Sequence, residues 1–176
     1  MPEVAIFLGS DSDLPKVKAC FNIFNEFGVS FETSISSAHR TPEKIKEQIE
    51  TAKDRGIKVI IAVAGGAAHL PGVIASHTTL PVIGVPIETQ IAGGIDSILS
   101  ILQMPSGIPV ATMPSGQAGG ANAALYAICI LSLCNKEYDS KLIEYRRKMK
   151  EKIFEKNNRL KSIGPLEYIK ELEEKK

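Results

Sequence analysis

The chain has 176 residues, of which 44% are hydrophobic, and this suits one compact domain with a substantial core. Lysine and arginine number 21 and aspartate and glutamate 20, so the formal net charge is +1. This balance excludes a general attraction to nucleic acid or to an anionic membrane. Any anion that the protein binds must be held by local side chains.

The first residues run directly into a short apolar stretch without the basic region or cleavage site of a signal peptide, so we expect a cytoplasmic protein. The longest apolar run, 121–134, is shorter than the roughly 20 residues that span a bilayer. It contains Asn122, and we expect it to form a buried helix. Cys20, Cys129 and Cys134 are odd in number and lie in apolar helical patterns, which indicates reduced, buried thiols.

Five segments have the pattern of β-strands. Four are short runs rich in β-branched residues and bounded by turn signals, as in strands that are buried on both faces. The fifth, Phe31–Ile35, is more polar, and we expect it nearer an edge. The four apolar segments are Val4–Leu8, Lys58–Val63, Pro81–Val85 and Ile108–Thr112.

Amphipathic helical patterns separate these strands, so the chain belongs to the α/β class, with a parallel sheet covered by helices on both sides. Asp13 is expected to cap one helix and Thr41 another. Gly28 and Gly56 lie where these helices should end. The apolar faces comprise Val17, Cys20, Phe21 and Phe24 in the first helix, and Ile45, Ile49 and Ala52 in the second.

From Lys136 onward the chain is rich in lysine, glutamate and arginine, and we separate a domain of residues 1–135 from a charged helical extension of residues 136–176. A single helix cannot bury its own apolar stripe. The extension therefore folds back on its domain or packs on a neighbouring subunit, and we expect the second because the αβ core already looks complete. The stripe comprises Leu142, Tyr145, Met149 and Ile153, and 161–165 interrupts it before a last short helix.

The loops after the five strands should meet at one edge of the sheet, where ligands bind in open α/β folds. Small and polar residues and two of the three histidines concentrate there. Glycines and alanines allow backbone N–H groups to approach a ligand, so this edge suits a small anion. The loops are Gly9–Asp13, Ser36–Pro42, Ala64–Gly72, Pro86–Gln90 and Met113–Gly120.

His39 is the sharpest catalytic candidate, because a loop imidazole can give and take a proton near neutrality. The spacing equally permits a histidine that bonds its own backbone. Arg40 offers a guanidinium for phosphate or carboxylate, or is a surface arginine. His69 is a ligand contact or a helix cap, and His77 is expected to complement a helix C-terminus.

Ser10 and Asp13 have two interpretations: turn and cap residues, or groups that bind a phosphate and ribose hydroxyls. The sequence lacks the dinucleotide fingerprint, the phosphate-binding loop of nucleotide hydrolases and the metalloprotease helix motif. Its histidines and cysteines lack zinc-site spacing. We therefore expect no metal, flavin, nicotinamide or ATP requirement.

Three loop motifs closely resemble those of phosphoribosylaminoimidazole carboxylase catalytic subunits, and further motifs follow in the same order over roughly residues 4 to 134. The loop motifs are Gly9-Ser10-x-Ser12-Asp13, Ser37-Ala38-His39-Arg40-Thr41-Pro42 and Ala64-Gly65-Gly66-Ala67-Ala68-His69-Leu70-Pro71-Gly72. The later motifs are Gly84-Val85-Pro86, Asp96-Ser97, Gln103–Thr112 and Asn122–Leu125. The resemblance implies a flavodoxin-like three-layer αβα sandwich that assembles as an octamer.

Arg40 and the third loop resemble the class I branch of this family, which converts N5-carboxyaminoimidazole ribonucleotide into 4-carboxy-5-aminoimidazole ribonucleotide in purine biosynthesis without a cofactor. The resemblance makes His39 the general acid and base, and it assigns Ser10, Asp13 and Arg40 to the ribonucleotide. It places His69 at the migrating carboxyl group. The other implied substrate-binding residues are Gly9, Ser12, Ser37, Ala38, Gly65, Gly66, Ala67, Ala68 and Leu70.

Two alternatives stay open at this point. One is the class II activity of the same fold, which carboxylates aminoimidazole ribonucleotide with carbon dioxide directly. The other is a non-catalytic nucleotide-binding module. An ATP-dependent synthetase is the implied supplier of the carbamate substrate. Residues 89–91 and 113–115 depart from the usual family pattern, so no substrate contact is carried over to them.

Overall fold

The computed structural model describes residues 1–174, and a parallel five-stranded sheet with the order β2-β1-β3-β4-β5 forms its centre. This is the strand order of the flavodoxin-like fold. The strands are β1 (Val4–Leu8), β2 (Phe31–Ile35), β3 (Val59–Gly65), β4 (Val82–Ile87) and β5 (Ala111–Thr112). The helices are α1 (Lys18–Phe27), α2 (Pro42–Glu50), α3 (Leu70–Ser76), α4 (Ile95–Leu102), α5 (Gly116–Ser132), α6 (Lys136–Ile163) and α7 (Pro165–Glu173), with short 3₁₀ turns η1 (Asp11–Asp13), η2 (Pro15–Val17) and η3 (Ala92–Gly94).

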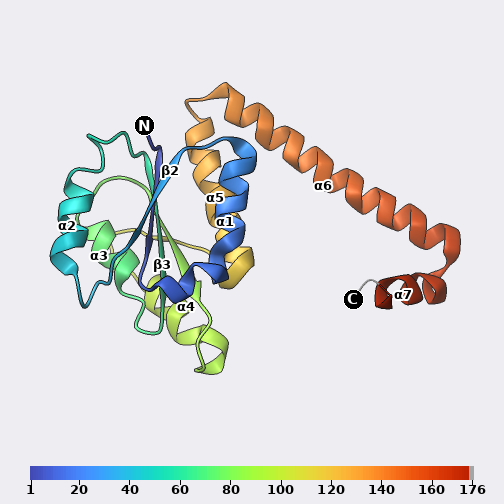
Figure 1. The fold of residues 1–176 in the computed structure, drawn as a ribbon, viewed down its shortest axis with the longest axis horizontal. Helices are drawn as coiled ribbons and strands as arrows, with labels where there is room; N and C mark the ends of the chain where they lie inside the picture. Colours follow the sequence, from blue (N-terminus) through green and yellow to red (C-terminus); the bar gives the residue numbers. More distant parts are fainter. Residues whose placement is uncertain (175–176) are drawn as a thin grey trace.

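Helices cover both faces of the sheet, with α1 and α5 on one side and α2 and α3 on the other (Figure 1). Side chains alternate along each strand, so Ile6 and Ile61 face the first layer, whereas Phe7 and Ile60 face the second. Both layers are buried, which explains the near-continuous apolar runs of the central strands. The α/β prediction and the three-layer sandwich are confirmed.

All five predicted strands are present, and Phe31–Ile35 is an edge strand as expected. The last strand is shorter than predicted, because only Ala111 and Thr112 pair with β4. A turn that closes with the hydrogen bond from Ile108 N to the Pro105 oxygen occupies the start of the predicted segment. Pro109 then has no N–H to donate to a ladder.

Three local predictions need correction. Asp13 lies inside η1, and it is the Ser10 side chain that caps this turn. Thr41 precedes α2, but its hydroxyl turns back to Ser37 instead of capping the helix. Gly56 has the expected positive φ of 89°, yet α2 already ends at Thr51. Gly28, in contrast, is the predicted left-handed C-cap of α1.

The three cysteines are free thiols, as predicted, but their environments differ. Cys20 is buried, Cys129 is half-buried and Cys134 is exposed, so the expectation of burial is wrong for Cys134. The predicted apolar helix at 121–134 is the larger part of α5, whose buried face packs against the sheet. Among residues 1–174, no helix is long and apolar enough to span a bilayer.

The C-terminal extension divides into two parts. The first turns of α6 pack on the domain, where Tyr138 donates a 2.6 Å hydrogen bond to Glu3 Oε2 and Lys141 Nζ donates to the Phe27 oxygen. The rest of α6 then projects away from the sandwich, and α7 turns back beside its end (Figure 1). Consequently the predicted stripe is split: Leu142 is buried, but Met149 is 53% and Ile153 is 62% exposed.

The bond between Tyr138 and Glu3 gives a prediction for stability. Burial, and then the hydrogen bond to Glu3, raise the pKa of Tyr138 to about 12 from an ordinary value of 10.0. The folded state therefore holds this proton more tightly, and the stabilisation is complete below pH 10 and is lost as the pH rises toward 12. We expect Tyr138→Phe to lower the free energy of unfolding by about 1.5 kcal/mol at pH 7.

Urea unfolding of the wild type and the variant at pH 7 and at pH 10.5 measures this effect, with Tyr126→Phe on the exposed face of α5 as the control. The difference between wild type and Tyr138→Phe should shrink at the higher pH. A difference that is equal at both pH values would contradict the assignment.

Candidate functional site

A cavity of about 490 Å³ lies at the carboxyl edge of the sheet, where the loops after β1, β2, β3 and β4 meet. Because the four strands run parallel and in register, their carboxyl ends reach this edge together. The lining residues are Gly9, Ser10, Asp13, Lys16, Ser37, Ala38, His39, Arg40, Ala64, Gly65, Ala67, His69, Leu70, Ile87, Glu88 and Thr89. Most of the residues expected at the site from the sequence are thus gathered around one cavity.

Three of the predicted substrate-binding residues do not line this cavity. Ser12 donates its hydroxyl to Ser10 Oγ at 2.9 Å. The N–H of Gly66 donates to Ser97 Oγ, and Ala68 is buried. These residues shape the loops whose other members face the cavity.

Sequence reasoning missed part of the lining. Lys16 was overlooked, although its spacing of three residues from Asp13 is typical of an ion pair across one helical turn. Ala64 and Ile87 end strands β3 and β4 and therefore reach the same edge. Thr89 lies in the loop after β4. We predicted no substrate contact for residues 89–91 because they depart from the family pattern.

His39 and His69 face each other across the cavity. His39 Nε2 lies 2.8 Å from His69 Nδ1, and the ring planes cross at 73°. One nitrogen must donate and the other must accept, so the tautomer of one ring fixes that of the other. His39 therefore bonds a second loop rather than its own backbone, and His69 has no side-chain capping bond although it precedes α3.

Arg40 extends along the neighbouring loop. Its Nε lies 3.4 Å from Ser37 Oγ, and its Nη2 lies 3.5 Å from the Gly9 oxygen. Its guanidinium has no carboxylate partner among the described residues and is exposed. The positive charge is therefore available to an anion beside His39.

Asp13 is a carboxyl group with little solvent around it, since the residue is only 7% exposed. Burial raises its pKa, and the charge of Asp11 adds to this, whereas Lys16 at 3.8 Å and a backbone hydrogen bond at Ser10 act in the opposite direction. Such a desolvated acceptor at a cavity wall suits hydroxyl groups of a ligand.

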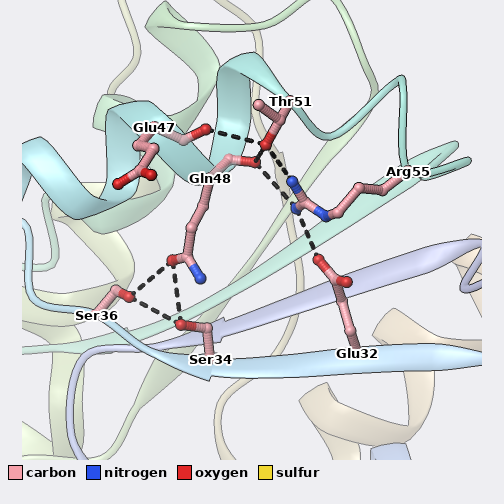
Figure 2. A network of polar contacts seen from close by, with 7 residues as sticks. All are labelled: Glu32, Ser34, Ser36, Glu47, Gln48, Thr51 and Arg55. Atoms are coloured by element: carbon pink, nitrogen blue, oxygen red, sulfur yellow. Dashed lines mark hydrogen bonds and ion pairs between the residues drawn. The ribbon is translucent and has the colours of Figure 1, made fainter.

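Polar side chains join the two elements that flank the loop that carries His39. Before the loop, Gln48 Oε1 of α2 accepts hydrogen bonds from Ser34 at 3.1 Å and from Ser36 at 3.2 Å (Figure 2). After the same helix, Arg55 donates to Glu32 on strand β2 (Figure 2). Strand β2 and helix α2, which flank the loop, are thereby joined to each other.

Asp13 generates a testable prediction for the ligand-free protein. Its pKa is raised in the folded state, so its ionisation weakens folding as the pH rises through that pKa. We expect Asp13→Asn to increase the free energy of unfolding at pH 7 but not at pH 3.5, where the carboxyl group is protonated. Urea unfolding at both pH values measures this, and Asp54→Asn at an exposed position away from the cavity is the control. A loss of stability at pH 7 would contradict the burial argument.

Comparison with known proteins places this geometry in a family. A family model described as AIR carboxylase matches residues 3–152. An N5-carboxyaminoimidazole ribonucleotide mutase of Pyrococcus horikoshii is 55% identical over 170 residues, which are 97% of this chain and 95% of the relative. The corresponding mutase of Thermotoga maritima is 50% identical over 173 residues, 98% of this chain and all of the relative.

A solved structure supports the same assignment. The crystal structure of Treponema denticola PurE superimposes with a TM-score of 0.82 at 31% sequence identity, and the match covers 92% of this chain and 99% of that one. The likeness thus extends over the sheet, its covering helices and much of the extension. The chain belongs to the AIR carboxylase family.

Proposed function

We propose that this protein is an N5-carboxyaminoimidazole ribonucleotide mutase, an isomerase of purine biosynthesis. The observation that carries the proposal is the His39–His69 pair, whose facing ring nitrogens are 2.8 Å apart, in one cavity with Arg40, whose charge no carboxylate among residues 1–174 pairs. The pair offers a proton donor and acceptor where the ring of a bound ribonucleotide would lie. Arg40 offers the charge for its anionic groups.

The other residues of the cavity bind the ribonucleotide in this proposal. Ser10 and Arg40 contact its phosphate, and Asp13 accepts hydrogen bonds from the ribose hydroxyls. His69 and the backbone of Gly65–Ala68 hold the carboxyl group that migrates. Gly9, Ser37, Ala38 and Leu70 complete the wall, while Ser12 acts through its hydrogen bond to Ser10.

The reaction requires two proton transfers in opposite directions. First the bond between the exocyclic nitrogen and the carboxyl carbon breaks, carbon dioxide is released within the cavity, and His39 protonates the nitrogen. The nucleophilic C4 of the imidazole then attacks the carbon dioxide, and His39 removes the C4 proton. One group serves both steps because the first leaves it in the protonation state that the second needs.

The mutase is favoured over the direct carboxylase by residues of this chain. Arginine follows the catalytic histidine here, whereas lysine typically does so in the class II branch. The third loop lacks the Arg-Ser-Asn sequence of that branch. Relatives that are 50% and 55% identical over nearly the whole chain are named as mutases.

Conversion of the carbamate by the purified protein, without added ATP or metal, tests this function. We expect 4-carboxy-5-aminoimidazole ribonucleotide to form rapidly from the carbamate, and His39→Asn to lower kcat by about 10²–10⁴-fold, because asparagine transfers no proton. Asn25→Ala on the surface of α1 is the control. Turnover from aminoimidazole ribonucleotide and carbon dioxide alone would instead establish the class II reaction.

The assembly follows from the extension and belongs to the same proposal. Residues 1–135 form the catalytic domain, and the extension packs through residues 136–174 on neighbouring subunits of a cytoplasmic octamer. The last two residues of the predicted extension, 175–176, lie outside the described residues. Exposed apolar side chains support this: Ile143 is 64%, Ile153 is 62% and Phe154 is 53% exposed on α6. The carbamate comes from an ATP-dependent synthetase.

Sedimentation velocity tests the assembly. We expect an octamer for the wild type and smaller species for the double variant Met149→Asp and Ile153→Asp, because the two charges oppose burial of the stripe. Glu155→Lys, on the far side of the helix from the stripe at about 3.6 residues per turn, should leave the octamer intact. A wild-type monomer would refute the proposal.

A further inference from the structure

Ser97, in the first turn of α4, joins two walls of the catalytic cavity. Its side chain is fully buried, and it accepts a 2.8 Å hydrogen bond from the N–H of Gly66 while it donates one of 2.8 Å to the oxygen of Ile87. Gly66 belongs to the loop after β3, and Ile87 ends β4. A single hydroxyl from a third element thus connects the loop after β3 with the end of the neighbouring strand β4.

The loop at Gly66 depends on outside support. Gly66 has a left-handed φ of 68°, and the bonds within the loop are short-range, from Ala68 N to the Gly66 oxygen and from His69 N to the Ala67 oxygen. Helix α4 contacts both polar groups of Gly66, since Ser100 Oγ, which donates a 2.7 Å hydrogen bond to the Asp96 oxygen, also lies 3.3 Å from the Gly66 oxygen. The position of this loop is therefore determined largely by α4.

The same helix also bonds to the loop after β4. Thr89 donates a 2.7 Å hydrogen bond to Asp96 Oδ1. This bond lowers the pKa of Asp96 and keeps it a carboxylate, the stronger acceptor. Thr89 and Gly65 both line the cavity, and Gly65 pairs with Ile87 in the sheet. The first turn of α4 thus bonds to both loops that continue these neighbouring strands.

We infer that Ser97 is a positioning residue that holds the cavity wall in place around carbon dioxide between its release and its recapture. This inference rests on the proposed function. After the bond to nitrogen breaks and before the bond to C4 forms, no covalent bond holds the carbon dioxide. Only the cavity walls then prevent its escape. Loss of the hydroxyl removes this partner from the part-buried Gly66 N–H and from the oxygen of buried Ile87, and we expect the loop to move in response.

A partition measurement on the full-length protein tests this inference. Purified Ser97→Ala is incubated with the carbamate substrate, and both the carboxylated product and free aminoimidazole ribonucleotide are quantified, after subtraction of spontaneous carbamate breakdown. We expect kcat for the carboxylated product to fall by about 100-fold, as for a displaced reacting group. We also expect aminoimidazole ribonucleotide to become the main product, because carbon dioxide leaves before recapture.

Matched variants separate positioning from folding. Ser97→Thr keeps the hydroxyl and should restore coupled conversion, whereas Ser132→Ala, whose hydroxyl bonds only within α5, should behave as wild type. If Ser97→Ala does not fold, Ser100→Ala tests the inference instead, because Ser100 is half-buried and its hydroxyl also lies at Gly66. For this variant we expect a smaller but measurable release of aminoimidazole ribonucleotide.

The outcomes are distinct. If the wild type converts its substrate and neither Ser97→Ala nor Ser100→Ala releases aminoimidazole ribonucleotide, the role of Ser97 is overturned. The mutase proposal is then unaffected. A release by Ser97→Thr as large as that by Ser97→Ala would also overturn the role of Ser97, because the hydroxyl would then be irrelevant. A wild-type protein that forms no carboxylated product would overturn both proposals.

Discussion

Parallel pairing of the central strands is the constraint on which the site depends. Leu8 lies beside Ile35 on one side and beside Val63 on the other, so the three following loops start at the same height. His39 and His69 are 30 residues apart in sequence, and the strand pairing brings His39 Nε2 to 2.8 Å from His69 Nδ1. A shift of one residue in register would move every side chain to the opposite face and separate these loops.

The loops themselves have little internal structure, and their support comes from helices on either side. Gln48 of α2 fixes the start of the His39 loop, and Ser97 of α4 fixes the loop that carries His69. Both use a buried or half-buried polar side chain to bind groups of the neighbouring strand or loop. The residues that perform chemistry can therefore remain exposed while their backbones are held.

Much of this arrangement could be predicted from the sequence, because it depends on local patterns. Runs of β-branched residues indicate the buried strands, and polar Phe31–Ile35 indicates the edge. Contacts between loops could not be predicted: the His39–His69 bond joins residues 30 positions apart, and spacing alone does not indicate it. Prediction also has a limit for local contacts, as Thr41 shows. Its hydroxyl could have capped α2, but it bonds the backbone N–H and oxygen of Ser37 instead.

Asp13 shows how the site departs from what stability alone would select. A buried carboxyl group with a raised pKa weakens the folded state at neutral pH, and Lys16 offsets only part of this from the cavity wall. A ribose that donates hydrogen bonds to this carboxylate would replace the water lost on folding. Asp13 therefore lowers the free energy of unfolding of the empty protein, and bound substrate offsets this loss. Substrate should stabilise the fold most at pH values at which Asp13 is ionised.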